Sequence, residues 1–347
     1  MKQIAIRPHS ALCYIFAAFA LCSPAVSQTP DFYKGKNISI IVSTDSGTGY
    51  DLYARTIARH WPRHIPGQPS IVAQNMAGAG GLRAANLLYS VSSNDGLTLG
   101  MVQSTVPYEP LYENKQATFD PLKFNWLGTP GQETSTMIVW QTVPVHSIDE
   151  ARKRGLTLGA TGAASTPAFY ARVINTLIGV PINVIAGYKN QNEIFLAMER
   201  GENDGSAATF YSTMKANKPD WLSEKKIRIL LQYGRAPNPE LKDVPFALDL
   251  IKDPQDRQVM ELAAAPLAVG RPLVAPPGVP AERVNLLRSS LMSTFDDPQY
   301  RADCLKQAID CDSALSGQAI TEILEMSYQS PEVIRKRLLQ IYVGKPR

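Results

Sequence analysis

Residues 38–61 join a strand, a turn of small residues and a helix, and this order constrains the fold more than any other feature of the chain. Residues 38–42 form an apolar run rich in β-branched side chains, which is typical of a buried strand. Residues 43–49 are small or polar and contain two glycines, as a tight turn requires. Beyond the turn, apolar side chains recur at helical spacing at Leu52, Ile57, Ala58 and Trp61. The sequence therefore predicts a buried strand that leads directly into a helix.

The predicted turn is suited to hold an anion. Backbone N–H groups, hydroxyls and the positive end of a helix dipole meet at one point there, so no lysine or arginine is needed. Asp51 is expected to cap the helix instead of contacting a ligand, because an acid there competes for the same N–H groups. The alternative is an ordinary turn whose hydroxyls cap their own helix. The candidate ligand contacts are Thr44, Asp45, Ser46, Thr48, Gly49 and Tyr50.

The same strand, turn and helix unit recurs twice. Its later copies are a strand at 71–73, a turn at 74–81 and a helix at 82–89, and then a strand at 156–160, a turn at 161–165 and a helix from 166. In the last copy Thr166 suits the N-cap, and Pro167 suits the first helical position. Alternation of strands and helices predicts an α/β fold with parallel sheets covered by helices.

The later turns supply further candidate ligand contacts, each with a structural alternative. Close packing of a strand on a helix explains a glycine at position 80 equally well. Thr166 is fully engaged if it caps its helix, and Tyr188 and Phe210 also suit a half-buried place in a core. These candidates are Gly80, Thr161, Ala164, Ser165, Thr166, Tyr188 and Phe210.

The rest of the chain reads largely as helix. Asn190 and Glu193 have the spacing of a capping box ahead of a helix at 194–200, which Gly201 ends. Five prolines between 266 and 280 predict an extended segment and a turn. Further helices are predicted at 281–295, 320–328 and 331–341.

The first 27 residues have the pattern of an export signal. Lys2 and Arg7 form a basic start, residues 11–21 are apolar but too short to span a bilayer comfortably, and a small-x-small site ends at Ser27. No later stretch is long and apolar enough to be transmembrane. We therefore expect a soluble periplasmic protein that begins near residue 28.

Size and charge narrow the class of protein. Without the signal about 320 residues remain (347 − 27), more than one core accommodates comfortably, so two domains are expected. The formal net charge falls from +4 to about +2, because two basic residues leave with the signal. No block of lysine or arginine stands out, which argues against nucleic acid or an anionic membrane as the main partner.

Two cysteines, Cys304 and Cys311, remain after the signal. On one straight helix they would lie ~10 Å apart, too far to bond. A helix that ends near Ala308, with Cys311 on a returning strand, would let them meet. The sequence leaves open a structural disulfide and two buried free thiols.

The sequence predicts no enzyme, metal site or cofactor. Residues 45–48 match the Asp-(Ser/Thr)-Gly-(Ser/Thr) signature of aspartic proteases, which would make Asp45 catalytic in an exported hydrolase, but no second copy exists. No nucleophile elbow, Walker A loop or G-x-G-x-x-G spacing occurs. His60 and His64 are four residues apart, but Pro62 disfavours a regular helix between them, and nothing nearby completes a metal-ligand set.

Six motifs in sequence resemble the Bug family, the TctC-like solute receptors of tripartite tricarboxylate transporters. The similarity covers nearly all of the chain after the signal. The first turn occupies residues 43–51, and the third turn aligns with 159–165. The other matches are Asn75 to Gly81, Asp95-Gly96-Leu97-Thr98-Leu99, Gly187-Tyr188-Lys189-Asn190, and Leu273 to Pro280 in a Leu-x-Ala-Pro-x-Gly-x-Pro pattern.

The resemblance implies a two-lobed periplasmic binding protein of the type II Venus-flytrap kind, each lobe a mainly parallel sheet flanked by helices. Residues 28–128 and 235–347 would form the first lobe and 129–234 the second, with crossings near 126–137 and 227–235. Such a receptor holds a small organic carboxylate by main-chain amides, hydroxyls and water, and hands it to a membrane permease without catalysis. We expect it to act as a monomer.

Three departures from the family pattern bear on the ligand. Thr48 replaces a glycine, Thr44 replaces an aromatic residue, and Asp45 stands where a small apolar residue is usual. An extra acid weakens binding of a diacid unless it points away or meets a cation, so a ligand with a carboxylate and an amino or hydroxyl group gains weight. Aromatic acid, aliphatic diacid and amino acid remain open. A receptor that reports its ligand to a signalling partner would carry the same site.

Overall fold

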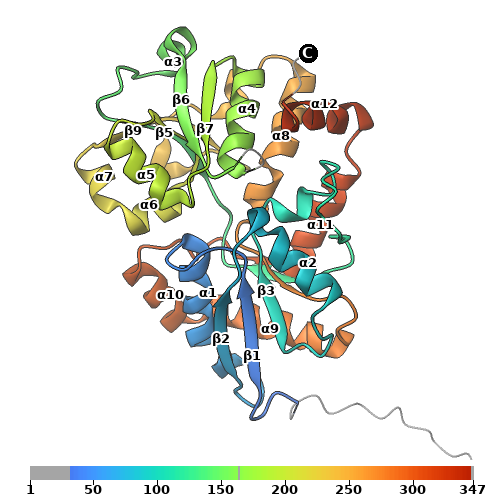
Figure 1. Ribbon diagram of the computed structural model, residues 1–347. Helices are drawn as coiled ribbons and strands as arrows, with labels where there is room; N and C mark the ends of the chain where they lie inside the picture. The colour runs from blue at the N-terminus through green and yellow to red at the C-terminus, as the bar shows by residue number, and fades with distance from the viewer. Residues whose placement is uncertain (1–31, 163–164, 345–347) are drawn as a thin grey trace, which may run out of the picture.

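Two β-sheets, each flanked by helices, make up the computed structural model, which describes residues 32–162 and 165–344 (Figure 1). One sheet has six strands in the order β11-β4-β10-β3-β1-β2, and the other has five in the order β7-β6-β8-β5-β9. In Figure 1 the six-stranded sheet lies below the five-stranded one. The predicted α/β fold with two lobes is confirmed.

The first sheet is parallel at one side and mixed at the other. β1 (Asn37–Val42) pairs in parallel with β2 (Ser70–Asn75) and with β3 (Thr98–Met101). β10 (Leu273–Ala275) runs antiparallel to β3 and to β4 (Asn125–Thr129), and β11 (Leu315–Ser316) closes the edge against β4. Because β1, β2 and β3 are parallel, the turns that follow them lie at one edge of the sheet.

The second sheet repeats this plan. β6 (Leu156–Ala160) pairs in parallel with β7 (Ile182–Ala186) and β8 (Gly205–Phe210). β5 (Ser135–Trp140) runs antiparallel to β8 and to β9 (Ile227–Tyr233). The turns after β6, β7 and β8 therefore also share one edge.

The helices fall into two groups by sequence and contact. Those next to the first sheet are α1 (Gly49–His60), α2 (Leu82–Ser90), α9 (Ala281–Asp296), α10 (Pro298–Lys306) and α11 (Gly317–Tyr328). Those of the second are α3 (Ile148–Arg154), α4 (Thr166–Ile178), α5 (Gln191–Glu199), α6 (Tyr211–Asn217) and α7 (Pro219–Ser223), with α8 (Pro254–Val269) and α12 (Glu332–Tyr342) packed against α4.

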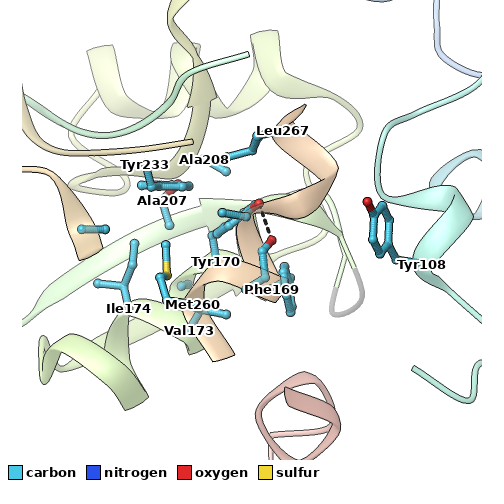
Figure 2. Packing of buried hydrophobic residues seen from close by; sticks show 14 of the residues in the cluster. Tyr108, Phe169, Tyr170, Val173, Ile174, Ala207, Ala208, Tyr233, Met260 and Leu267 are labelled. Carbon is cyan, nitrogen blue, oxygen red and sulfur yellow. Dashed lines mark hydrogen bonds between the residues drawn. The ribbon is translucent and has the colours of Figure 1, made fainter. Parts of the chain in front are cut away.

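The apolar faces of α4 and α8 join in one core (Figure 2). Val173 and Ile174 of α4 and Met260 of α8 are fully buried, and the Tyr170 hydroxyl donates to the backbone oxygen of Ala263 at 2.8 Å. Each such side chain contributes roughly 1.5–3 kcal/mol when buried. This packing fixes the position of α4, and thus of the turn that precedes it.

The chain passes between the sheets at more points than the sequence suggested. It leaves the first sheet after β4 and enters the second at β5, within the predicted 126–137. β9 of the second sheet occupies most of residues 227–235, and the next strand of the first sheet is β10, which the chain reaches through residues 270–272, after α8. A third passage at 329–331 connects α11, which contacts β4, with α12, which contacts α4 and α8. The predicted lobe boundaries remain predictions.

Two local predictions need correction. Ser165, not Thr166, is the N-cap of α4, so Pro167 is the second helical residue. Pro266 lies inside α8 and not in an extended segment, which begins only after Gly270. The predicted capping box is confirmed in its first half, because the Asn190 side chain accepts the Glu193 N–H at 3.2 Å.

Cys304 and Cys311 form a disulfide, with their Cα atoms 6.3 Å apart. α10 ends at Lys306, close to the predicted Ala308, but Cys311 lies in the loop ahead of β11 and not on a returning strand. Within residues 32–162 and 165–344, no helix combines the length and the hydropathy that a membrane crossing needs.

Candidate functional site

The two sheets present the carboxyl ends of their parallel strands to each other. The turn after β1 leads into α1, and Gly49 at the start of α1 lies so close to α6 that a Cβ there would be 2.6 Å from Thr213 Oγ1. The ring of Tyr50 lies 6.5 Å from that of Phe210, at the end of β8. Because β8 is parallel to β6, the turns at 43–48 and 161–165 belong to facing edges, where open α/β sheets bind ligands.

The hydroxyls of the first turn are bonded within the turn. Thr48 is the N-cap of α1, and its Oγ1 accepts the Asp51 N–H at 3.4 Å. The Thr48 hydroxyl donates to the Asp45 backbone oxygen at 2.9 Å, so Thr44 is the donor in its 2.7 Å contact with Thr48. The hydroxyls of Thr44 and Thr48 thus fit the alternative given in the sequence analysis, an ordinary turn that caps its own helix.

Asp51 closes the first turn from inside. Its buried carboxylate accepts from the Gly47 N–H at 2.9 Å, the Ser46 hydroxyl at 3.3 Å and the side chains of Arg55 and Asn75, both at 2.9 Å. Burial raises the pKa of Asp51, but these hydrogen bonds outweigh burial, and the pKa is lowered. The expectation that Asp51 caps α1 is therefore wrong. As the third helical residue it reaches back past the cap to Gly47 N–H.

Among the described residues, the start of α1 has unpaired backbone N–H groups at two buried residues. Within the part of the chain that the structure describes, the N–H groups of Gly49 and Tyr50 have no hydrogen-bond partner. The side chain of Tyr50 offers only its ring, because its hydroxyl accepts the Ser104 N–H at 2.9 Å and donates to Gly270 O at 3.4 Å. Asp45 is half-buried, and its carboxylate has no partner among the described residues.

The glycines of the second turn were explained in the sequence either by close packing or by ligand contact, and the structure gives different answers for two of them. A Cβ at Gly81 would lie 2.8 Å from Val106, so close packing requires this glycine. Gly80 is exposed, has a φ of +64° and has open space where a Cβ would be. Packing therefore does not account for Gly80, beyond its left-handed backbone.

The third turn leaves more groups open than the first. The Ser165 hydroxyl donates to Gly162 O at 2.7 Å and does not cap α4. Among residues 32–162 and 165–344, the hydroxyls of Thr161 and Thr166 and the N–H groups of Thr166 and Ala168 have no partner. Ala164 lies outside the described residues. An uncapped N-terminus of a helix of 13 residues is suited to a negative charge.

Tyr188 and Phe210 occupy different surroundings. The Tyr188 hydroxyl accepts from the Asn203 amide at 3.3 Å, and its ring lies beside Gly159, so this half-buried tyrosine is tied to its own lobe. Phe210 is half-buried between Tyr50 and the guanidinium of Arg271, whose carbon lies 5.1 Å from the Phe210 ring centroid.

Sequence reasoning missed Arg271 and its partners. Its side chain is 1% exposed and forms an ion pair with Glu133. It also donates to Ser212 at 3.2 Å and Thr213 at 2.8 Å. The available signal was a charged residue between two apolar runs, directly ahead of the Leu273 to Pro280 motif, since a charge in such surroundings needs a partner.

No metal centre emerges within the described ranges, which contain no group of three His, Cys, Asp or Glu residues that could hold an ion. His60 and His64 each contact a single aspartate, Asp303 and Asp297, both at 2.8 Å. Apart from the Asp45 carboxylate, the open groups at the facing edges are amides and hydroxyls, which can donate to carboxylate oxygens.

Two lobes with facing carboxyl edges and two open helix N-termini define a solute-binding fold. The model of the tripartite tricarboxylate transporter family receptor, TctC, matches residues 54–339, and the chain belongs to this family. The resemblance seen in the sequence is thus confirmed. No curated protein matches the chain.

Solved structures share the fold at low sequence identity. R. palustris Rpa4515 with adipate is 20% identical, with a TM-score of 0.67 and coverage of 89% of this chain and 97% of its own. The periplasmic binding protein BugD (17%, TM-score 0.67, coverage 90% and 98%) and MatC from Rhodopseudomonas palustris with bound malate (17%, TM-score 0.67, coverage 88% and 99%) are equally similar.

Proposed function

We propose that this protein is a periplasmic receptor that captures a small carboxylate between its two lobes and delivers it to a tripartite tricarboxylate-type membrane permease. It acts as a monomer without catalysis. One observation carries the proposal: α1 and α4 start at the facing edges with backbone N–H groups that have no partner among the described residues.

Each start offers a carboxylate a different set of donors. The first lobe supplies the N–H groups of Gly49 and Tyr50, and the second supplies Thr161, Thr166 and the Ala168 N–H. The candidates Thr44, Ser46, Thr48 and Ser165 shape the turns more than they contact ligand, because their hydroxyls are already bonded within the turns.

The energetics allow useful affinity without an exposed arginine. Hydrogen bonds to a charged group contribute ~1.5–3 kcal/mol each, and a helix N-terminus ~0.3–2 kcal/mol. Three or four bonds and one helix end give ~5–14 kcal/mol before several kcal/mol are lost to ordering the ligand and closing the lobes. Micromolar affinity needs ~8 kcal/mol, so apolar contacts such as Phe210 must contribute.

The unpartnered Asp45 bears on the ligand class. Adipate and malate are bound by two proteins of similar fold, and both are dicarboxylates. A half-buried acid beside the α1 start repels a second carboxylate and attracts an amino or hydroxyl group. We therefore expect a carboxylate that also carries a hydroxyl or amino group to bind better than a plain diacid.

The test is a thermal-shift screen of the secreted chain. A panel of dicarboxylates, hydroxy acids, aromatic acids and amino acids is compared with a panel of amines and neutral sugars. A ligand at 100 times its Kd adds about 2.7 kcal/mol and raises the melting temperature visibly. Shifts with amines or sugars, and none with carboxylates, would overturn the proposal.

A matched pair of variants localises the site. Ser165→Phe places a bulky ring at the start of α4, whereas Ser289→Phe places the same ring on the exposed face of α9. The first should abolish the carboxylate shift, and the second should keep it. Equal shifts in both variants would remove the third turn from the site.

A further inference from the structure

Arg271 and Glu133 are buried charges in two different connections between the sheets. Arg271 lies at 270–272, between α8 and β10, and Glu133 lies at 130–134, between β4 and β5. Their side chains are 1% and 3% exposed and form an ion pair. Buried charges persist only when they are paired and hydrogen-bonded, so this pair ties the two connections together.

The pair also contacts both lobes. On the second lobe, Arg271 donates to Ser212 and Thr213 of α6, and the Ser212 hydroxyl donates to Glu133 at 2.7 Å. On the first lobe, the guanidinium carbon lies 4.2 Å from the ring centroid of Tyr53 and 5.5 Å from that of Tyr50, both in α1. The flat guanidinium can stack on rings and donate at its edge together.

We propose that Arg271 and Glu133 form an inter-lobe clamp, in which Arg271 is a positioning residue that holds the start of α1 against α6. The clamp deepens the proposed function, since a ligand that bridges the lobes needs them in register. Gly49 supports this role: a Cβ at Gly49 would lie 2.6 Å from Thr213 Oγ1 and 3.0 Å from Arg271 Nη2, so glycine gives the clamp a close approach to the α1 start.

The clamp acts on position and not on ligand charge. The negative charge of Glu133 offsets that of Arg271, and both side chains are closed to solvent. Arg271 therefore does not itself contact the carboxylate. Its effect reaches the ligand through the two Gly49 and Tyr50 amides, whose helix it holds in place.

The experiment measures lobe contact in the ligand-free secreted chain. Two variants break the clamp: Arg271→Met removes the cation, and Ser212→Ala with Thr213→Val keeps the ion pair but removes its bonds to α6. Both should raise the radius of gyration in solution scattering. Both should accelerate amide exchange at the start of α1 and in α6 by about tenfold or more.

The matched control is Arg337→Met, which removes another shielded arginine, 3.6 Å from Asp256, in the contact of α12 with α8. This variant should leave the radius of gyration and α1 exchange unchanged. If Arg271→Met does not fold, the Ser212→Ala, Thr213→Val variant decides. A wild-type radius and wild-type exchange in that folded variant would overturn the clamp. No ligand enters this test, so its failure is distinct from failure of the carboxylate screen.

Discussion

The turn after β1 and the turn after β6 look alike in sequence but differ in how far they satisfy themselves. In the first, Thr48 caps α1 and Asp51 binds Gly47, Ser46 and Arg55. In the third, the Ser165 hydroxyl bonds only to Gly162 among the described residues, and α4 begins without a side-chain cap from them. The first turn is a rigid frame, and the third has free donors.

Under the proposed function, this difference predicts which groups would recognise a ligand. A hydroxyl that is already bonded gives up that bond to meet a ligand, so its net contribution is small. The hydroxyls of Thr161 and Thr166 have no partner among the described residues, so they exchange only a bond to water for a bond to the ligand. Recognition by side chains should therefore depend on the third turn, whereas the first turn contributes its backbone amides.

The largest expected effect tests the rigid frame. Asp51→Ala leaves Arg55, Asn75 and the Gly47 N–H without their acceptor and should lower the free energy of unfolding by about 3 kcal/mol. Ser165→Ala, the matched change in the third turn, should cost less than about 1 kcal/mol. Urea unfolding followed by circular dichroism measures both. Equal costs would break the comparison.

The next effect tests the free donors. Thr166→Val keeps the side-chain shape but removes the hydroxyl, and should weaken binding of the best carboxylate of the screen by about tenfold or more. Thr44→Val, in the first turn, should change affinity less than about threefold. Titration calorimetry measures both. A greater loss in Thr44→Val would reverse the assignment of the two turns.

Acid unfolding sharpens the account of Asp51. Because its folded pKa is lowered, Asp51 contributes stability that is present above the unfolded value of about 3.9 and is lost as pH falls through the folded pKa. Asp51→Asn should therefore show a shallower loss of stability below about pH 4 than the wild type. Urea midpoints at several pH values measure this slope, and identical slopes would contradict the lowered pKa.

The smallest expected effect concerns Asp45. If its free carboxylate faces the ligand, Asp45→Ala should strengthen binding of plain diacids such as adipate by about fivefold, the worth of ~1 kcal/mol of repulsion at 4 Å in water. Competition calorimetry with adipate is the measurement. Unchanged affinity would show that Asp45 points away from the bound ligand.

Local patterns in the sequence predicted local structure well. β6 occupies the residues 156–160 predicted for a strand, and Asn190 caps α5 as its spacing to Glu193 indicated. These features depend on hydrophobic runs and capping residues a few positions apart. The predicted N-cap of α4 was wrong by one residue, because Ser165 and Thr166 are adjacent and both suit an N-cap.

Features that depend on tertiary contact were not predictable. Pro266 normally breaks a helix, but α8 tolerates it because its apolar face packs against α4 and α12. Arg271 and Glu133 stand far apart in sequence with no shared spacing, so their pairing is visible only in space. Which hydroxyls are bonded within their own turn likewise needed coordinates, because both turns contain serine, threonine and glycine.

The third passage of the chain between the sheets, at residues 329–331, restricts how the two lobes can move relative to each other. Two lobes joined only by the neighbouring connections at 130–134 and 270–272 could twist as well as bend. The additional connection from α11 to α12 resists the twist. We therefore expect the lobes to open by bending about an axis near the segment from α11 to α12. Stiffening that segment would slow the parting of the lobes without altering any atom that a cargo molecule could contact.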